Sequence, residues 1–236
     1  SPLWVSVRSG DVHSGQWAAD ENALPARSLP VVGSDEIFRV QDLCVVQGSR
    51  ELVNEVSLTL RVGEMLAITG PNGVGKSSLL TALVSTASAQ NICRLVPEIV
   101  SSLFITETLE EELSRADSLA GHKDSGLTAI TFWSILATEE SPELLSVHPR
   151  DLSAGTQVAL AIALQLAWKP QVILIDEPTR GLDAVSREAM AEVLRCVAET
   201  GTAVLFASHD EAFVSDLGCR VLAIREGALV PEEVSA

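Results

Sequence analysis

The feature that most constrains how this chain can fold is a glycine-rich segment, residues 70–77, with the sequence GPNGVGKS. An apolar run at residues 65–69 leads into it, and residues 76–84 follow with apolar side chains at helical spacing. A segment of the form G-x-x-x-x-G-K-[ST] between a strand and a helix is typical of phosphate-binding loops. The sequence therefore predicts a strand, a tight loop and a helix that together hold a nucleotide.

Each residue type in this loop has a physical reason to be there. Glycines let the backbone pass close to phosphate oxygens, so that N–H groups at the helix N-terminus point at them. Lys76 can place a positive charge beside the β- and γ-phosphates, and the Ser77 hydroxyl can bind Mg²⁺. The residues of the loop that we predict to bind ATP are Asn72, Gly73, Val74, Gly75, Lys76, Ser77 and Ser78.

A second, acidic motif follows the aliphatic residues 172–175, which are succeeded at once by Asp176 and Glu177. A carboxylate at the end of a buried strand can hold Mg²⁺, usually through water, and we predict this role for Asp176. Glu177 is predicted to be catalytic, because its carboxylate can orient or deprotonate the attacking water. Two acids after a strand mean little alone, but beside a phosphate loop the two motifs support each other.

Composition excludes several classes of function. Asp and Glu outnumber Lys and Arg by 32 to 16, a net charge of −16, so most of the surface would repel nucleic acid, and we expect no nucleic-acid partner. The four cysteines form no close pair, which argues against a zinc motif or a disulfide framework and favours the cytosol. The longest apolar run, residues 158–167, is about half a membrane span, so a role at a membrane requires a partner.

The order of predicted elements indicates an α/β protein. Apolar strands alternate with helical patterns, which predicts a mostly parallel sheet covered on both faces. We expect strands at residues 37–46, 52–62, 65–69, 172–175, 203–207 and 221–224, and helices at residues 76–84, 127–137, 154–168 and 186–198. Glu226 and Gly227 are expected to form a hairpin turn. Residues 1–36 have a linker-like composition, and residues 37–232 are predicted to form one ATPase domain, with a helical subdomain at about 101–150.

Three further motifs make the interpretation more specific. Residues 152–156, LSAGT, open a predicted helix and resemble the LSGGQ signature of ATP-binding cassette (ABC) ATPases. Residues 177–183, EPTRGLD, resemble that family's catalytic glutamate and the D-loop that ends at Asp183. His209 follows a predicted strand, where the family has its switch histidine. Five motifs in the family's order, spread over almost the whole chain, identify it as a member.

The resemblance implies a fold, partners and cofactors. It implies a P-loop α/β domain of ABC type, with a mostly parallel central sheet, a small antiparallel β subdomain and a helical subdomain. It also implies Mg²⁺-dependent ATP hydrolysis with Glu177, His209 and Lys76 as catalytic residues. In the family two cassettes meet head to tail, so Ser153 and Gly155 are expected to serve the nucleotide of a second ABC ATPase domain, and Asp183 is expected to bind nucleotide as well.

Within the family the sequence looks most like the ATPase subunits of energy-coupling-factor importers. These take up vitamins or transition-metal ions through a separate integral membrane subunit, so we expect this chain at the cytoplasmic face of the membrane, attached peripherally. Some such proteins carry two cassettes in one chain. A linker-like start without Met is what the second cassette of a tandem would show.

Three positions depart from the family pattern. Ala154 and Thr156 replace a glycine and a glutamine of the signature. Glu98 stands where the family has a neutral glutamine, and we predict that it lies near Mg²⁺ and the γ-phosphate, with an exposed loop acid as the alternative. No aromatic residue stands in the usual adenine-stacking region, which holds Val45, Val46 and Gln47.

Two other functions stay open at this point. One is a cassette that binds ATP to gate a partner with weak or no hydrolysis, which Glu98 favours and Glu177 opposes. The other is a non-transport ABC ATPase. Such a protein is expected to have a basic surface, a zinc motif or a long coiled-coil insert, and the sequence shows none of these. The acidic residues between 107 and 117 are expected on a solvated helix face rather than at a metal. Trp133 and its apolar neighbours are expected in the core or at a docking surface for the membrane subunit.

Overall fold

The computed structural model describes residues 32–47, 50–86, 89, 92–122 and 125–232. Its main element is a six-stranded sheet with the order β4-β5-β6-β3-β7-β8. These strands are β3 (Met65–Thr69), β4 (Cys93–Val96), β5 (Val172–Asp176), β6 (Ala203–Ala207), β7 (Arg220–Arg225) and β8 (Ala228–Pro231). All neighbours are parallel except β7 and β8, which form an antiparallel hairpin. Its turn is the predicted one, with Glu226 and Gly227 both at positive φ.

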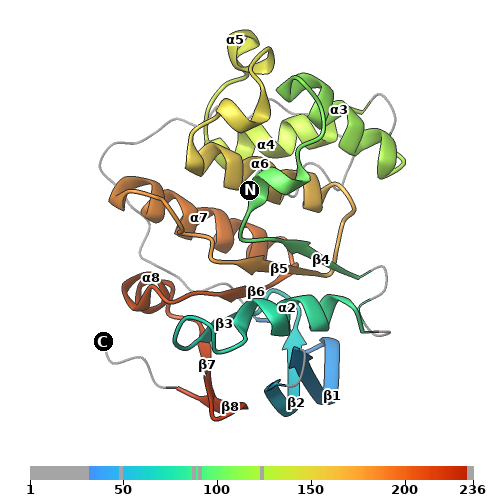
Figure 1. Ribbon diagram of the computed structural model, residues 1–236. Helices are drawn as coiled ribbons and strands as arrows, with labels where there is room; N and C mark the ends of the chain where they lie inside the picture. The colour runs from blue at the N-terminus through green and yellow to red at the C-terminus, as the bar shows by residue number, and fades with distance from the viewer. Residues whose placement is uncertain (1–31, 48–49, 87–88, 90–91, 123–124, 233–236) are drawn as a thin grey trace.

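A second, two-stranded antiparallel sheet lies at the bottom of Figure 1, beside β7 and β8 of the main sheet. It consists of β1 (Glu36–Gln47) and β2 (Arg50–Arg61), which pair along most of their length. Together with the mostly parallel main sheet and the helices, this confirms the predicted fold class. The predicted linker, residues 1–36, lies almost entirely outside the described residues, and the first described strand begins at Glu36.

Helices cover both faces of the main sheet, because its strand residues are apolar on both sides. In β3, Met65 and Ala67 point into the core below α6, α7 and α8, whereas Leu66 and Ile68 point into the core formed with α2, β1 and β2. The period of two along a strand sends successive side chains to opposite faces. The covering helices are α2 (Lys76–Val84), α6 (Ala154–Leu166), α7 (Ala184–Glu199) and α8 (Glu211–Leu217). Helix α8 was not predicted from the sequence.

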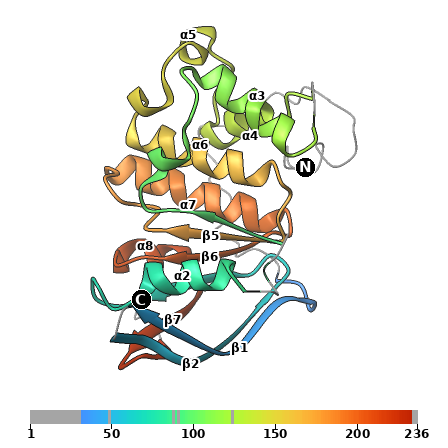
Figure 2. The same cartoon turned by 45° about the vertical axis from the view of Figure 1, so that its right-hand side comes forward.

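The third part is a group of short helices that packs on α6, at the top of Figures 1 and 2. Its elements are η2 (Val100–Leu103), α3 (Leu109–Leu119), α4 (Leu127–Leu136), α5 (Pro142–Leu145) and η3 (Pro149–Asp151). In α4, Phe132 and Trp133 are buried and contact each other edge to face, which confirms the core interpretation of this segment, while Ile130 is 37% exposed.

The prediction that the acidic residues between 107 and 117 lie on a solvated face holds for Glu107, Glu110 and Glu111, which are exposed, but is wrong for the other two. Glu112 and Asp117 are buried, with 0% and 5% exposure. The Glu112 carboxylate accepts hydrogen bonds from the N–H groups of Ile105 and Thr106 and pairs with Arg115. Burial alone would raise the pKa of Glu112, but these partners lower it below its usual range. Glu112 therefore holds in place the segment that leads into α3. Helical spacing alone does not reveal this role.

The sheet decides where chemistry can take place. Strands β4, β5, β6 and β3 are parallel neighbours, so their carboxyl ends lie along one edge. The loops that leave this edge carry the glycine-rich segment after β3, the acidic pair at the end of β5 and His209 after β6. In open α/β sheets, ligands bind in the crevice at this edge.

Candidate functional site

The glycine-rich loop wraps tightly around the start of α2. Gly70, Gly73 and Gly75 have φ values of 137°, 77° and 117°, which residues with a side chain rarely adopt. A Cβ at Gly75 would also lie 3.1 Å from the Cβ of Leu52, because β2 passes close to the loop. Lys76, the first residue of α2, is buried and donates from Nζ to the carbonyl oxygen of Gly70 at 2.8 Å. The loop therefore presents a helix N-terminus with an ammonium group inside its turn.

Three of the predicted catalytic residues meet at this edge of the sheet. The Glu177 carboxylate lies between Lys76 and His209, with Oε1 3.6 Å from Lys76 Nζ and Oε2 2.8 Å from His209 Nδ1. Glu177 and Lys76 are only 8% and 6% exposed, whereas the His209 side chain is 55% exposed. A carboxylate in contact with two nitrogen groups is held in one orientation, so it can act on a water molecule in a fixed position.

The backbone at Glu177 explains why its side chain points into the site. Its φ is 52°, an uncommon conformation for a residue with a side chain. The Glu177 N–H donates to the carbonyl oxygen of Ala207 at 2.9 Å, which holds the end of β5 against β6. The strained residue thus sits where β5 ends and the chain turns, a place where strain often accompanies function.

Asp176 has the properties expected of a cation ligand. One of its carboxylate oxygens, Oδ1, is buried and has no hydrogen-bond partner. Burial raises the pKa of Asp176, a hydrogen bond with Ser77 opposes this, and the charges of Glu98 and Glu177 raise it further. A divalent cation would relieve both the unpaired oxygen and the repulsion between carboxylates. Ser77 and Asp176 therefore fit a site for Mg²⁺.

Glu98 is exposed and lines the same cavity as Asp176 and Glu177, and its place near Mg²⁺ stays a prediction. Its carboxylate forms an ion pair with the Arg180 guanidinium, and the two side chains are 37% and 59% exposed. Both residues line a cavity of about 160 Å³, together with Asp176 and Glu177. Arg180 was missed from the sequence. The available signal in the sequence was its position just after the acidic pair.

The signature segment forms the start of α6. Ser153 is the N-cap, and its Oγ accepts a hydrogen bond from the Thr156 N–H at 3.2 Å. The Thr156 hydroxyl lies 2.8 Å from the same oxygen. A Cβ at Gly155 would have only ordinary contacts, the nearest at 3.7 Å to Leu182 and Ser186. Hydroxyl and N–H groups at a helix N-terminus can bind an anion.

Asp183 caps a second helix, α7. Its Oδ1 accepts from the Ser186 N–H at 2.8 Å, and the hydrogen bonds from Ser186 hold its pKa below the usual range. The side chain is exposed, and the caps of α6 and α7 are close together, because Gly155 of one adjoins Ser186 of the other. The structure thus brings the signature segment and the segment that ends at Asp183 side by side.

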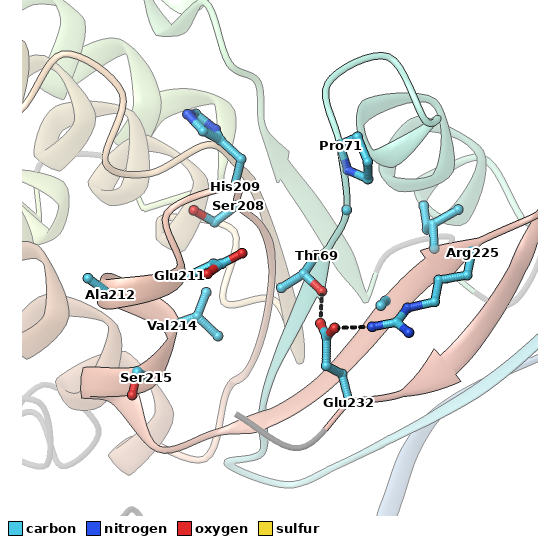
Figure 3. Close-up of a pocket in the computed structure, with 13 residues that line it drawn as sticks. Thr69, Pro71, Ser208, His209, Glu211, Ala212, Val214, Ser215, Arg225 and Glu232 are labelled. Atoms are coloured by element: carbon cyan, nitrogen blue, oxygen red, sulfur yellow. Dashed lines mark hydrogen bonds and ion pairs between the residues drawn. The ribbon is translucent and has the colours of Figure 1, made fainter. Parts of the chain in front are cut away.

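A cavity of about 760 Å³ opens on the other side of the phosphate loop, between the ends of β3, β6 and β7 (Figure 3). Pro71 and His209 face it from the two loops. Its floor holds Thr69, which donates to Glu232 at 2.7 Å, and Glu232 also pairs with Arg225 at 2.5 Å. The phosphate loop and His209 therefore border the same cavity.

The predicted adenine region lies at the end of β1. Val45 is buried, at 8% exposure, but Val46 is 60% exposed. Successive side chains of a strand point to opposite faces, so Val45 is buried and the apolar side chain of Val46 is exposed near the end of the strand. Gln47, the last residue of β1, is exposed as well.

Comparison with known proteins identifies the family. A sequence profile described as ABC transporter matches residues 53–180, more than half of the chain. A provisionally named ABC transporter ATP-binding protein of Streptomyces avermitilis is 34% identical over 234 residues, or 90% of this chain but 40% of the relative. A Bacillus subtilis protein, provisionally named the HMP/thiamine import ATP-binding protein YkoD, is 29% identical over 83% of this chain and 38% of its own. The chain therefore spans about 40% of the length of these relatives.

Solved structures agree in fold. CbiO1 of Clostridium perfringens, described as part of the ABC transporter complex CbiONQ, has a TM-score of 0.69 at 22% identity, over 83% of this chain and 87% of its own. The dimeric cassette MJ0796, bound to ADP and phosphate, has a TM-score of 0.68 at 21% identity, over 84% and 99%. With its phosphate loop, acidic pair and helix-capping signature, the chain belongs to the ABC transporter family.

Proposed function

We propose that this domain binds and hydrolyses Mg²⁺-ATP to power import of a small molecule, a vitamin or a metal ion, through a separate membrane component. The observation that carries the proposal is the convergence of Lys76, Glu177 and His209 at the carboxyl edge of the sheet. A buried ion pair often adds little to stability, so folding alone does not explain the Glu177 carboxylate at this edge. It does have a use toward a water molecule beside a phosphate.

The chemistry assigns a role to each side chain. The ATP phosphates would lie against the N–H groups of the loop at the start of α2, where Lys76 can exchange its carbonyl contacts for phosphate oxygens. Glu177 accepts a proton from the attacking water or aligns it in line with the γ-phosphate, and His209 holds the carboxylate through its Nδ1 contact. Ser77 and Asp176 would hold Mg²⁺, which neutralises phosphate charge when bound.

A second ABC ATPase domain is part of the proposal. Ser153, Gly155 and Asp183 are grouped at the starts of α6 and α7, where the hydrogen bonds of Ser153 and Asp183 lie within their own helices. In a head-to-tail pair this group would close on the nucleotide of the opposite domain and complete the clamp on the transferred phosphoryl group. A second cassette in the same longer chain is compatible with relatives of which this chain spans about 40%.

A membrane partner is the third component. No described helix is long and apolar enough to cross a membrane. Ile99 and Ile105, which flank η2 next to the nucleotide site, are 66% and 72% exposed, an apolar surface suited to docking another protein. Relatives include proteins named for import of HMP/thiamine and of hemin, which supports an importer attached at the cytoplasmic face.

We also propose residues 37–232 as the ATPase domain, residues 101–150 as its helical subdomain and residues 1–36 as a linker.

The test uses the assembled complex and the isolated chain in parallel. Because the signature of one domain serves the other, the isolated chain at low concentration is expected to hydrolyse ATP slowly. Its specific activity should rise with concentration or when the partner domain is added. A monomer by light scattering with full turnover independent of concentration would contradict the paired mechanism. Co-purification from detergent-solubilised membranes would identify the integral subunit, and with it the class of substrate.

A further inference from the structure

The loops that follow β4 and β5 carry opposite charges in contact. Glu98 lies two residues beyond the end of β4, and Arg180 lies four residues beyond the end of β5. The two strands are parallel neighbours, with Val96 paired to Ile175, so both loops leave the sheet side by side. The Arg180 backbone N–H donates to the Glu177 carbonyl at 3.1 Å, and this turn directs its guanidinium to Glu98.

This contact lies in an unusually acidic place. Glu98, Asp176 and Glu177 line the same small cavity of about 160 Å³. Two basic side chains form ion pairs with carboxylates of this cavity: Lys76 with Glu177, and Arg180 with Glu98. ATP brings several negative charges of its own. Three carboxylates would therefore oppose its approach unless the cations offset them, since like charges at this range interact strongly where water is partly excluded.

We propose that Arg180 is a positioning residue that holds Glu98 in place and offsets its charge, so that the phosphates of ATP can approach the acidic edge. The inference rests on the proposed nucleotide site and gives a role to Arg180, a residue of the segment 177–183 for which the sequence predicted none. Arg180 acts through Glu98 and not by contact with ATP. Its loss should therefore matter only while Glu98 carries its charge.

The experiment is a double-mutant cycle on the full chain, with ATP affinity at saturating Mg²⁺ measured by calorimetry. Arg180→Ala is expected to weaken ATP binding about two- to fivefold, the range of coupling that exposed ion pairs reach. In the Glu98→Gln background the same substitution should weaken binding by no more than about 1.4- to 2.2-fold, which is half of that free energy. Arg180→Lys should keep most of the affinity, because it retains the charge. Thermal unfolding of each variant separates loss of binding from loss of fold.

A matched control is available at the opposite end of the sheet. Arg39 pairs with Glu36, with exposures of 55% and 38% that resemble those of Arg180 and Glu98, and it lines a cavity with Met65 at the start of β3. Arg39→Ala removes the same charge and should leave ATP affinity unchanged. Equal losses from Arg180→Ala in both backgrounds, or no loss in either, would overturn the inference. A wild-type chain that binds no ATP would instead contradict the proposed function.

Discussion

Replacement of Glu177 by glutamine separates the chemical step from nucleotide binding. Glutamine keeps the length and shape of the side chain but removes the charge that can accept a proton. The Glu177 carboxylate is 8% exposed and contacts Lys76 at 3.6 Å and His209 at 2.8 Å. We expect the variant to bind Mg²⁺-ATP and to lose turnover, because the loop and the residues that fit Mg²⁺ stay intact.

The size of the effect follows from the contacts. A positioned general base contributes about 10²–10⁴-fold to a rate, which is about 3–5 kcal/mol at 1.36 kcal/mol per tenfold. The cost in stability should be smaller. Lys76 keeps the carbonyl oxygens of Gly70 and Pro71 as acceptors, at 2.8 and 3.4 Å, so its ammonium group is not left unpaired. The loss of one charged contact should then lower the free energy of unfolding by about 1–3 kcal/mol.

The assay is steady-state ATP hydrolysis by the assembled complex, with ATP binding measured on the same preparation. Glu199→Gln is the control, because Glu199 is exposed at the far end of α7 and undergoes the same chemical change. We expect the control to keep its activity and Glu177→Gln to fall below a hundredth of it. Activity above a tenth of wild type would refute the assignment of Glu177 as the base. Loss of ATP binding would show that its contact with Lys76 organises the loop instead.

Three further outcomes are expected. Thr156→Val removes the hydroxyl that lies 2.8 Å from Ser153 Oγ, and it should slow hydrolysis by the complex about fivefold, the effect of one hydrogen bond. Thr156→Ser keeps a hydroxyl and should not slow hydrolysis. The isolated chain should bind ATP and GTP with similar affinity by calorimetry, and Val46→Tyr should tighten ATP binding about tenfold by stacking on the base. Glu112→Gln should lower the free energy of denaturant unfolding by about 1–3 kcal/mol at neutral pH. Because the folded pKa of Glu112 lies below its ordinary value of 4.5, the difference should be full above pH 4.5 and disappear as pH falls through the folded pKa.

Each of these expectations has a contradicting result. Equal activity of the valine and serine variants at position 156 would mean that the threonine hydroxyl does not orient Ser153. A strong preference for ATP over GTP in the wild type would show that a residue other than Val46 reads the base. A stability difference for Glu112→Gln that does not change with pH would show that the side chain acts by packing and not by its charge.

Local sequence determined much of the protein. The glycine-rich loop, the strand before it and the helix after it follow from short-range geometry, since only glycines reach φ values such as 117° without strain and apolar periods of two and 3.6 separate strands from helices. The predicted strand at Ala203–Ala207 and the helix at Lys76–Val84 have the bounds expected of them. The order of five motifs sufficed to identify the family, because each motif is a short run of residues that can be read without knowing which other segments it meets.

Tertiary structure alone decided which side chains meet. Glu98 and Arg180 are 82 residues apart, and only the pairing of β4 with β5 brings their loops together. The burial of Glu112 depends on the loop that carries Ile105 and Thr106 folding back over the start of α3, which no helical period reports. The direction of the Glu177 side chain depends on a backbone φ of 52° held by a hydrogen bond to β6. Sequence patterns specify faces and turns, whereas contacts between loops arise from the strand order, since a parallel sheet places the ends of distant segments along one edge.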